Sequence, residues 1–174
     1  MFSVFEIIAM LVTALAIGYM FKGILPETGD DKKDFIKSSV VGGAAIILHE
    51  LGHKFTALYF GATAVYNANL AGLAFGVILR YMNFPIFVVP AYVSISGNIP
   101  GIAFSLVALA GPLTNLSLFL ISKVLVDRHL LKTPDQFMTA HVFGKINFWL
   151  FLFNIMPIPG FDGFQAISGL LRSF

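Results

Sequence analysis

The 174-residue chain contains no cysteine, and only 11% of its residues are charged. The absence of cysteine excludes disulfides and thiolate metal ligands, so any metal must be held by histidine, carboxylate or main-chain oxygen. A soluble domain has about 25% charged and 45–50% apolar residues, whereas this chain is 57% hydrophobic with a mean hydropathy of +0.86. Its net charge of +2 forms no basic patch of the kind that binds nucleic acid. The composition therefore predicts a membrane protein.

Four stretches are apolar over roughly the 20 residues that a helix needs to cross a bilayer. They cover residues 2–25, 39–60, 102–126 and 140–156, and the last is expected to continue beyond a break into 166–171. The first stretch lacks a basic start and is too long for a signal peptide, so we interpret it as a retained span. The sequence thus predicts an α-helical multi-pass membrane protein with about four transmembrane helices.

The region between the second and third predicted spans, residues 61–101, is apolar but interrupted by glycine and proline. Within it, residues 86–95 are rich in β-branched and aromatic side chains, which favours strand over helix. Pro85 and Pro90 argue against a straight span. We expect short strands or re-entrant segments packed on the helices, and such a strand offers an edge that can pair with an extended peptide.

The second predicted span carries the motif His49-Glu50-Leu51-Gly52-His53. Two histidines four residues apart lie on one face of a helix, so both imidazoles can reach one metal ion. Glu50 lies between them in sequence, where it can act as a general base on water. Ionisable side chains are costly at bilayer depth, which indicates that these residues have a function.

A catalytic zinc site usually has three protein ligands, so the histidine pair needs a partner. Asp162 is our candidate, because the prolines and glycine of segment 157–160 break the last helix and let the carboxylate turn inward. The structural alternative for Asp162 is a cap or turn position before Gly163. For the remaining histidines, His129 and His141, a surface or interfacial position is the favoured interpretation.

Three motifs in this order resemble those of the site-2 proteases, which are intramembrane zinc metalloproteases. The first is the histidine motif at 49–53, and the second is Gly-Pro-Leu-Thr-Asn at 111–115. The third is Asn-Ile-Met-Pro at 154–157 followed by Asp-Gly at 162–163. The resemblance covers residues 39–171. It implies zinc bound by His49, His53 and Asp162, with Glu50 as general base and Asn154 in contact with the substrate or transition state. It divides the chain into an N-terminal helix with a charged loop (1–38) and a catalytic core (39–174).

Several positions carry a second interpretation. Phe161 and Phe164 are bulkier than the residues usual beside the ligand in this family, which affects substrate fit. Asn115 and Asn154 can instead satisfy backbone groups that are freed beside prolines. The small residues 42–45 are interpreted as a helix-packing patch, with space for water as the alternative.

The resulting prediction is an integral multi-pass protein, expected in the cell membrane, that uses zinc to cleave transmembrane proteins in regulated intramembrane proteolysis. One alternative is a silent relative that binds membrane proteins without cutting them, against which the intact Glu50 argues. Another is a metal carrier or channel, which needs more ionisable residues along a path. Lysines in loops 26–37 and 127–136 favour a cytoplasmic position for these loops, whereas the resemblance implies the opposite orientation.

Overall fold

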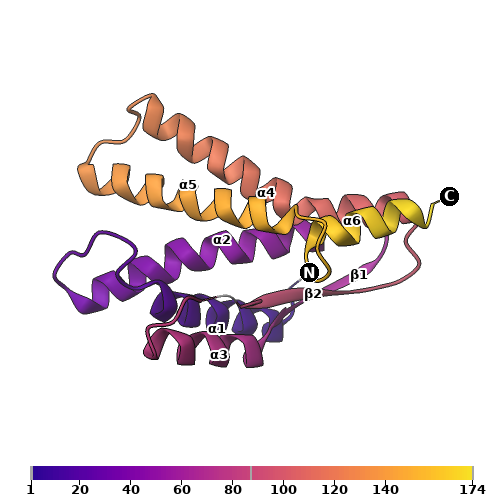
Figure 1. The fold of residues 1–174 in the computed structure, drawn as a ribbon, viewed down its shortest axis with the longest axis horizontal. Helices are drawn as coiled ribbons and strands as arrows, with labels where there is room; N and C mark the ends of the chain where they lie inside the picture. Colours follow the sequence, from indigo (N-terminus) through magenta and orange to yellow (C-terminus); the bar gives the residue numbers. More distant parts are fainter. Residues whose placement is uncertain (1, 87, 174) are drawn as a thin grey trace.

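The structure is a computed structural model that describes residues 2–86 and 88–173. Within them there are six helices and one two-stranded antiparallel sheet, which lies at one end of the molecule (Figure 1). In chain order the elements are α1 (Val4–Phe21), α2 (Asp31–Tyr59), β1 (Thr63–Ala68), α3 (Leu70–Tyr81), β2 (Ala91–Ser96), α4 (Gly101–Asp127), α5 (Pro134–Asn154) and α6 (Asp162–Leu171). The prediction of a mostly helical chain with short strands between the second and third long helices is confirmed.

Three helices, α1, α2 and α4, are long and apolar enough to cross a membrane, and they match the first three predicted spans. The fourth predicted span, 140–156, forms most of α5, which begins at Pro134 and ends at Asn154. The break expected after it is present, and α6 begins at Asp162 rather than at residue 166. A multi-pass topology with about four spans stays a prediction.

The charged loop expected at residues 26–37 is shorter than predicted, because α2 already begins at Asp31. The cause is an N-cap. The Asp30 carboxylate accepts hydrogen bonds from the main-chain N–H groups of Lys32 (3.0 Å) and Lys33 (3.2 Å), and such a cap satisfies donors that a helix start leaves free. The sequence-based domain boundary at residue 38 consequently falls inside α2.

The segment 61–101 contains a helix, α3, which the sequence analysis did not predict. The Asn69 side chain caps it by accepting from the N–H of Gly72. Gly76, taken from sequence as a break, is a close contact instead: a Cβ there would lie 2.4 Å from the Met20 sulfur. Of the strand predicted over 86–95, residues 91–95 belong to β2, while 88–90 are irregular and Phe87 lies outside the described residues.

Small residues bring α1 and α2 together in antiparallel fashion. A Cβ at Gly43 would meet the Cβ of Ala14 at 2.8 Å, and one at Gly18 would collide with Ser39. The helix-packing interpretation of residues 42–45 is therefore confirmed. On the other side of α2 lies α4, which also packs against α5 and α6 (Figure 1).

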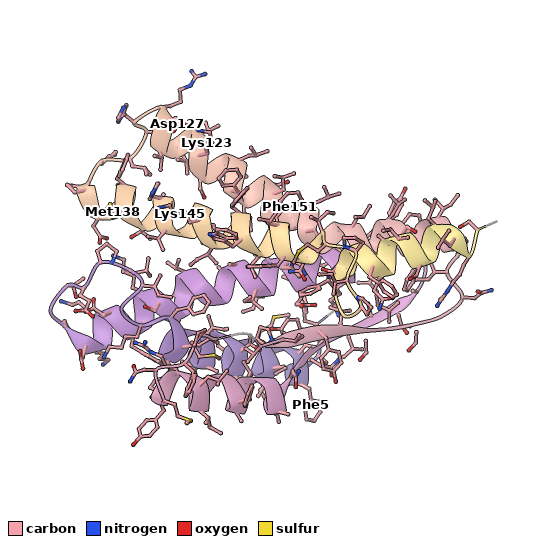
Figure 2. The ribbon with its side chains drawn as sticks, viewed as in Figure 1. Phe5, Lys123, Asp127, Met138, Lys145 and Phe151 are labelled. Atoms are coloured by element: carbon pink, nitrogen blue, oxygen red, sulfur yellow. The ribbon has the colours of Figure 1, made fainter. Side chains whose placement is uncertain are left out.

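The two ends of the bundle differ in polarity. The last turn of α4, before the loop to α5, carries an exposed Lys123–Asp127 ion pair of 2.6 Å (Figure 2). Lys37 of α2 pairs with Asp135 at the start of α5 at this same end. At the opposite end, the two strands and α6 lie beside the second half of α2, which carries the histidine motif.

Candidate metal centre

The structure brings His49, His53 and Asp162 together around one point. The histidines lie one turn apart on α2, and Asp162 is the first residue of α6. The Nε2 atoms of the two imidazoles are 3.1 Å apart, and Asp162 Oδ2 lies 3.1 Å from His49 Nε2 and 3.4 Å from His53 Nε2. Both histidines are buried and the carboxylate is largely so. Side chains from two distant parts of the sequence thus form one compact cluster.

The cluster has the dimensions of a zinc site. Zinc binds imidazole nitrogen and carboxylate oxygen at about 2.0–2.2 Å, so two ligand atoms of a tetrahedral site are about 3.3–3.6 Å apart. The three separations between the His49, His53 and Asp162 atoms are 3.1, 3.1 and 3.4 Å. Three such ligands leave a fourth tetrahedral position for water or substrate, as catalytic zinc sites do.

Hydrogen bonds fix which nitrogen of each imidazole is free to bind metal. His53 Nδ1 is 2.8 Å from the carbonyl oxygen of Val107, which can only accept, so Nδ1 carries the proton. His49 Nδ1 contacts Asn115 Oδ1. The amide of Asn115 donates through Nδ2 to Asn147 Oδ1 (2.8 Å), which leaves Oδ1 as the acceptor for His49. Both Nε2 atoms therefore present lone pairs toward Asp162, which is the tautomer that metal binding requires.

Asp162 Oδ2 has no hydrogen-bond donor within the described residues, although it is buried. A carboxylate that ligates a metal does so in its ionised form. Two lone pairs and an anionic oxygen that face one another need a cation between them, and the donor set of two imidazoles and a carboxylate suits zinc.

Gly111 of α4 keeps the space beside the ligands open. A Cβ at this position would lie 2.3 Å from His53 Nε2 and 2.6 Å from His49 Nε2. It would therefore occupy space next to the two nitrogens that face the metal position. The absence of a side chain lets the α4 backbone approach the histidine pair. The motif at 111–115 was visible in the sequence, but this role of its glycine was not.

The turn before α6 presents Asp162 to the histidines. Gly160 has a φ of +99°, a left-handed conformation that favours glycine. A Cβ at Gly163 would lie 2.1 Å from the carbonyl oxygen of Ile155, so α6 starts directly against the end of α5. Ser105 of α4 donates to the carbonyl of Ala166 at 2.6 Å and anchors α6. The N-cap of α6 is Phe161, so Asp162 is not the cap residue that the structural alternative assumed.

The other two predicted site residues are in α2 and at the end of α5. Glu50 is buried in α2, next to His49 in sequence and about 100° around the helix from it. Asn154 is the last residue of α5 and half-buried, and its amide donates to the carbonyl of Leu150 in the same helix at 3.0 Å. A catalytic role for Asn154 stays a prediction.

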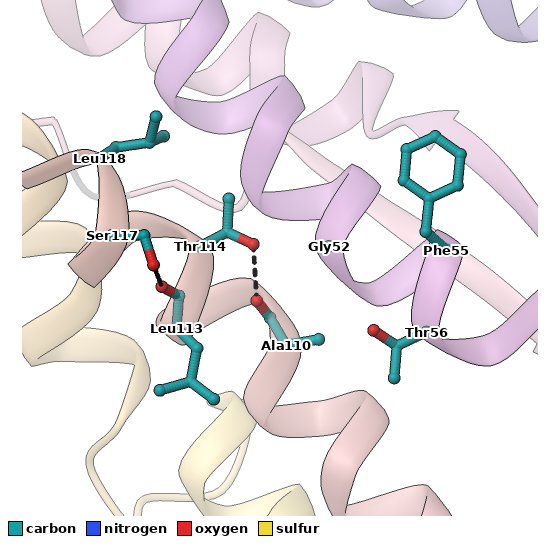
Figure 3. Close-up of a pocket in the computed structure, with 8 residues that line it drawn as sticks. All are labelled: Gly52, Phe55, Thr56, Ala110, Leu113, Thr114, Ser117 and Leu118. Carbon is teal, nitrogen blue, oxygen red and sulfur yellow. Dashed lines mark hydrogen bonds between the residues drawn. The ribbon is translucent and has the colours of Figure 1, made fainter. Parts of the chain in front are cut away.

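An open groove of about 360 Å³ follows the seam between α2 and α4 next to the histidines (Figure 3). It is lined mainly by apolar atoms of Gly52, Phe55, Thr56, Ala110, Leu113, Thr114, Ser117 and Leu118. Thr114 Oγ1 donates to the carbonyl of Ala110 at 2.8 Å, and a Cβ at Gly52 would be 2.5 Å from that hydroxyl. The two helices therefore approach closely at Gly52, within the lining of the groove.

Two buried histidines and an aspartate with a glutamate beside them, in a bundle of apolar helices, define a site of the zinc hydrolase type. The chain is 34% identical over 173 residues to a candidate zinc metalloprotease of Methanocaldococcus jannaschii. The aligned region covers 96% of this chain and 85% of that relative. It is 30% identical over 128 residues to a candidate zinc metalloprotease of Synechocystis, covering 74% of this chain and 29% of that longer protein. No family model and no solved structure matches the chain. The chain belongs to this family of zinc metalloproteases.

Proposed function

We propose that this zinc metalloprotease acts inside the membrane and hydrolyses peptide bonds within or near transmembrane segments of membrane proteins. The observation that carries the proposal is the position of the two histidine ligands on α2, a 29-residue helix apolar enough to cross a bilayer. His49 is ten residues before the end of α2 at Tyr59, or about 15 Å along the axis. This depth, together with the three site-2 protease motifs, supports cleavage of a bond below the membrane surface.

The residues of the site divide the work of hydrolysis among them. His49, His53 and Asp162 hold zinc, which when bound supplies Lewis acidity that acidifies water and polarises the scissile carbonyl. Glu50 takes a proton from the attacking water and transfers it to the nitrogen of the leaving amine. Asn115 and the Val107 carbonyl fix the two imidazole rings, which keeps the ligand geometry while the reaction proceeds. Asn154 is assigned to the contact with substrate.

The substrate segment must be extended before it can be cut, because a helix shields its peptide bonds. The β1–β2 pair lies beside the catalytic half of α2 and supplies main-chain groups to which an extended segment can pair. The enzyme in this account is an integral multi-pass protein of the cell membrane, with residues 39–174 as the catalytic core. Its partners are a transmembrane substrate and the lipid bilayer.

Two other functions fit the site less well. A metal carrier needs successive ligand groups along a path, whereas His49, His53 and Asp162 form one compact group, the one such group found among the described residues. A silent relative needs no general base, yet Glu50 is retained and buried next to the ligands at the cost of placing a carboxyl in an apolar bundle.

The test is cleavage of a model transmembrane substrate by the purified protein in detergent. We expect a chelator to stop cleavage and added zinc to restore it. Glu50→Gln should keep one zinc per chain but slow cleavage by roughly 10²–10⁴-fold, the usual contribution of a general base. Glu27→Gln, which changes an exposed carboxylate in the 22–30 loop, is the control for loss of an acidic group and should cleave at the parent rate. A zinc-loaded Glu50→Gln protein that cleaves as fast as the parent would refute the assignment of Glu50.

A further inference from the structure

A second cluster of buried charged groups lies next to the metal ligands and has no part in the mechanism above. Glu6 of α1 and Lys54 of α2 are each only 3% exposed and form an ion pair. Lys54 Nζ also donates to the carbonyl oxygen of Ala64 at 2.6 Å, and Glu6 Oε1 accepts from the main-chain N–H of Tyr66 at 2.8 Å. The pair therefore uses its charges to bind the backbone of β1.

The register of the sheet shows which edge of β1 is bound in this way. Tyr66 is opposite Val93, and Ala64 is opposite Ile95. In an antiparallel pair, opposite residues alternate between those that exchange two hydrogen bonds and those whose N–H and C=O groups both point away from the partner strand. Because the Tyr66 N–H and the Ala64 carbonyl go to Glu6 and Lys54, both pairs are of the second kind.

A further hydrogen bond confirms this alternation. The main-chain N–H of Asn69 donates to the carbonyl of Pro90 at 3.0 Å. Every second residue of β1 counted back from Asn69, namely Asn67 and Val65, therefore bonds to β2. At the other end of β1, the N–H of Ala62 donates to the carbonyl of Ala57 in α2 at 3.0 Å. Three groups on the outer edge of β1 are thus occupied: the Ala62 N–H by the end of α2, and the Ala64 carbonyl and Tyr66 N–H by the two charged side chains.

The outer edge of β2 is different. By the same register, the N–H and C=O groups of Val93 and Ile95 point away from β1. Within the described residues, no hydrogen bond outside the ladder uses these groups. Their side chains pack with Ala57, Ala64 and Val107. Since the Val107 carbonyl holds the imidazole of His53, the open edge of β2 lies one layer of side chains from the metal ligands.

We propose that Glu6 and Lys54 form an edge cap that closes β1 to strand pairing, so that an extended substrate can pair only with β2. An unpaired strand edge binds other extended chains, and a buried backbone group without a partner is costly. Lys54 offers the donor and Glu6 the acceptor that a neighbouring strand would supply. The inference rests on the proposed function and goes beyond it: Glu6 and Lys54 are positioning residues that select the edge and therefore the register of the substrate.

Disulfide trapping in this cysteine-free chain tests which edge is used. Ser94 of β2 and Val65 of β1 are directly opposite each other and both exposed, so they form a matched pair. Each is changed singly to cysteine in the Glu50→Gln protein, which is then mixed with a model transmembrane substrate carrying one cysteine near the scissile bond. A strand on β2 is about 5 Å from position 94 but about 10 Å from position 65, since strands are 4.7–4.9 Å apart.

We expect Ser94→Cys to trap the substrate at least about tenfold more efficiently than Val65→Cys. Equal trapping, preferential trapping at position 65, or no trapping at either position would overturn the proposal. Failure of the proposed function is seen separately, as an enzyme with Glu50 intact that cleaves none of the same substrate.

Removal of the cap gives the second arm of the experiment. Glu6→Gln/Lys54→Met removes both charges together, so neither is left buried alone, and exposes the carbonyl of Ala64 to pairing. We expect trapping at Val65→Cys to rise severalfold and the KM for cleavage to rise severalfold at constant zinc content, with a smaller change in kcat. Lys123→Met/Asp127→Asn removes the exposed pair at the far end of the bundle and should change neither quantity.

A folded, zinc-loaded Glu6→Gln/Lys54→Met protein that traps substrate at position 65 no better than the capped protein would contradict the cap. If that variant does not fold, the comparison of positions 94 and 65 in the capped protein decides alone.

Discussion

Two buried polar clusters begin at adjacent residues of α2, and they are built in opposite ways. His53 faces α4 and α6, where two lone pairs and the Asp162 carboxylate converge without a donor between them. Lys54 faces α1 and β1, where its ammonium group meets the Glu6 carboxylate and the Ala64 carbonyl. The first cluster has an excess of acceptors, whereas donors and acceptors are matched in the second.

The difference shows how each cluster is stabilised in an apolar bundle. Buried charges are tolerated when they are paired and hydrogen-bonded, as Glu6 and Lys54 are. The cluster of His49, His53 and Asp162 lacks a positive partner of its own, so it depends on a cation from solution. A self-neutralised cluster fits a structural or positioning role, while an unneutralised one fits a metal site, and the predictions below test that distinction.

The largest effect is expected from Gly111→Ala. The added Cβ would lie 2.3 Å from His53 Nε2, so the imidazole must leave its position and the ligand set is broken. We expect zinc content to fall from one per chain to near zero, with loss of cleavage. The matched control is Gly144→Ala in α5, where the nearest atom is the Cβ of Ser122 at 3.0 Å and zinc content should stay at the parent level. Metal analysis of the two purified variants measures this, and full zinc occupancy in Gly111→Ala would contradict the geometry.

The next effect concerns the matched cluster. Lys54→Met alone leaves the Glu6 carboxylate buried without its partner, which should destabilise the protein by about 3–5 kcal/mol. Glu6→Gln/Lys54→Met removes both charges and should cost clearly less. Thermal or denaturant unfolding in detergent compares the two variants with the parent. If the single and double variants were equally unstable, the two charges would not depend on each other.

A smaller effect is expected from Asn115→Leu, which removes the acceptor that orients His49. Loss of such a supporting contact usually weakens metal binding by about 10–100-fold. Zinc affinity measured by competition with a chelator should fall within this range while the fold is kept. Asn67→Leu, at a half-buried position of β1, is the control and should leave affinity unchanged. Equal affinities for the Asn115→Leu and parent proteins would show that the hydrogen bond to His49 Nδ1 has no influence on the metal.

The smallest effect is expected at the start of α2, far from both clusters. Asp30→Ala removes the side chain that caps the N–H groups of Lys32 and Lys33, which should cost about 1 kcal/mol of unfolding free energy. Zinc content and cleavage should not change. Asp31→Ala, which removes an exposed partner of Lys22, should have a smaller effect on unfolding than Asp30→Ala. A change in zinc content in either variant would mean that the two ends of α2 are coupled.

Local patterns in the sequence carried much of this account. A run of apolar residues predicts a spanning helix wherever it occurs, and α1, α2 and α4 lie where such runs predict them. The four-residue spacing of the histidines determines that they share a helical face. The helix break before Asp162 is visible as proline and glycine, and the order of the motifs suggested its meeting with the histidines.

The features that were missed depend on contacts between distant residues. The α3 helix contains two glycines that look like breaks, but Gly76 is where α3 packs on Met20. The Val107 carbonyl that orients His53 is a main-chain group, so its side chain gives no signal. Asn147 could have been noticed as an amide within an apolar helix. The Glu6–Lys54 pair joins residues 48 positions apart, which no local pattern reveals.

The most direct test of the account is X-ray absorption at the zinc edge on the purified, zinc-loaded protein. The account predicts one zinc per chain with two imidazole nitrogens at about 2.0–2.1 Å and carboxylate or water oxygen at about 2.0–2.2 Å. It also predicts that Asp162→Ala loses this spectrum. A protein that binds no zinc, or binds it without two imidazoles, would contradict the claim that His49, His53 and Asp162 hold the metal.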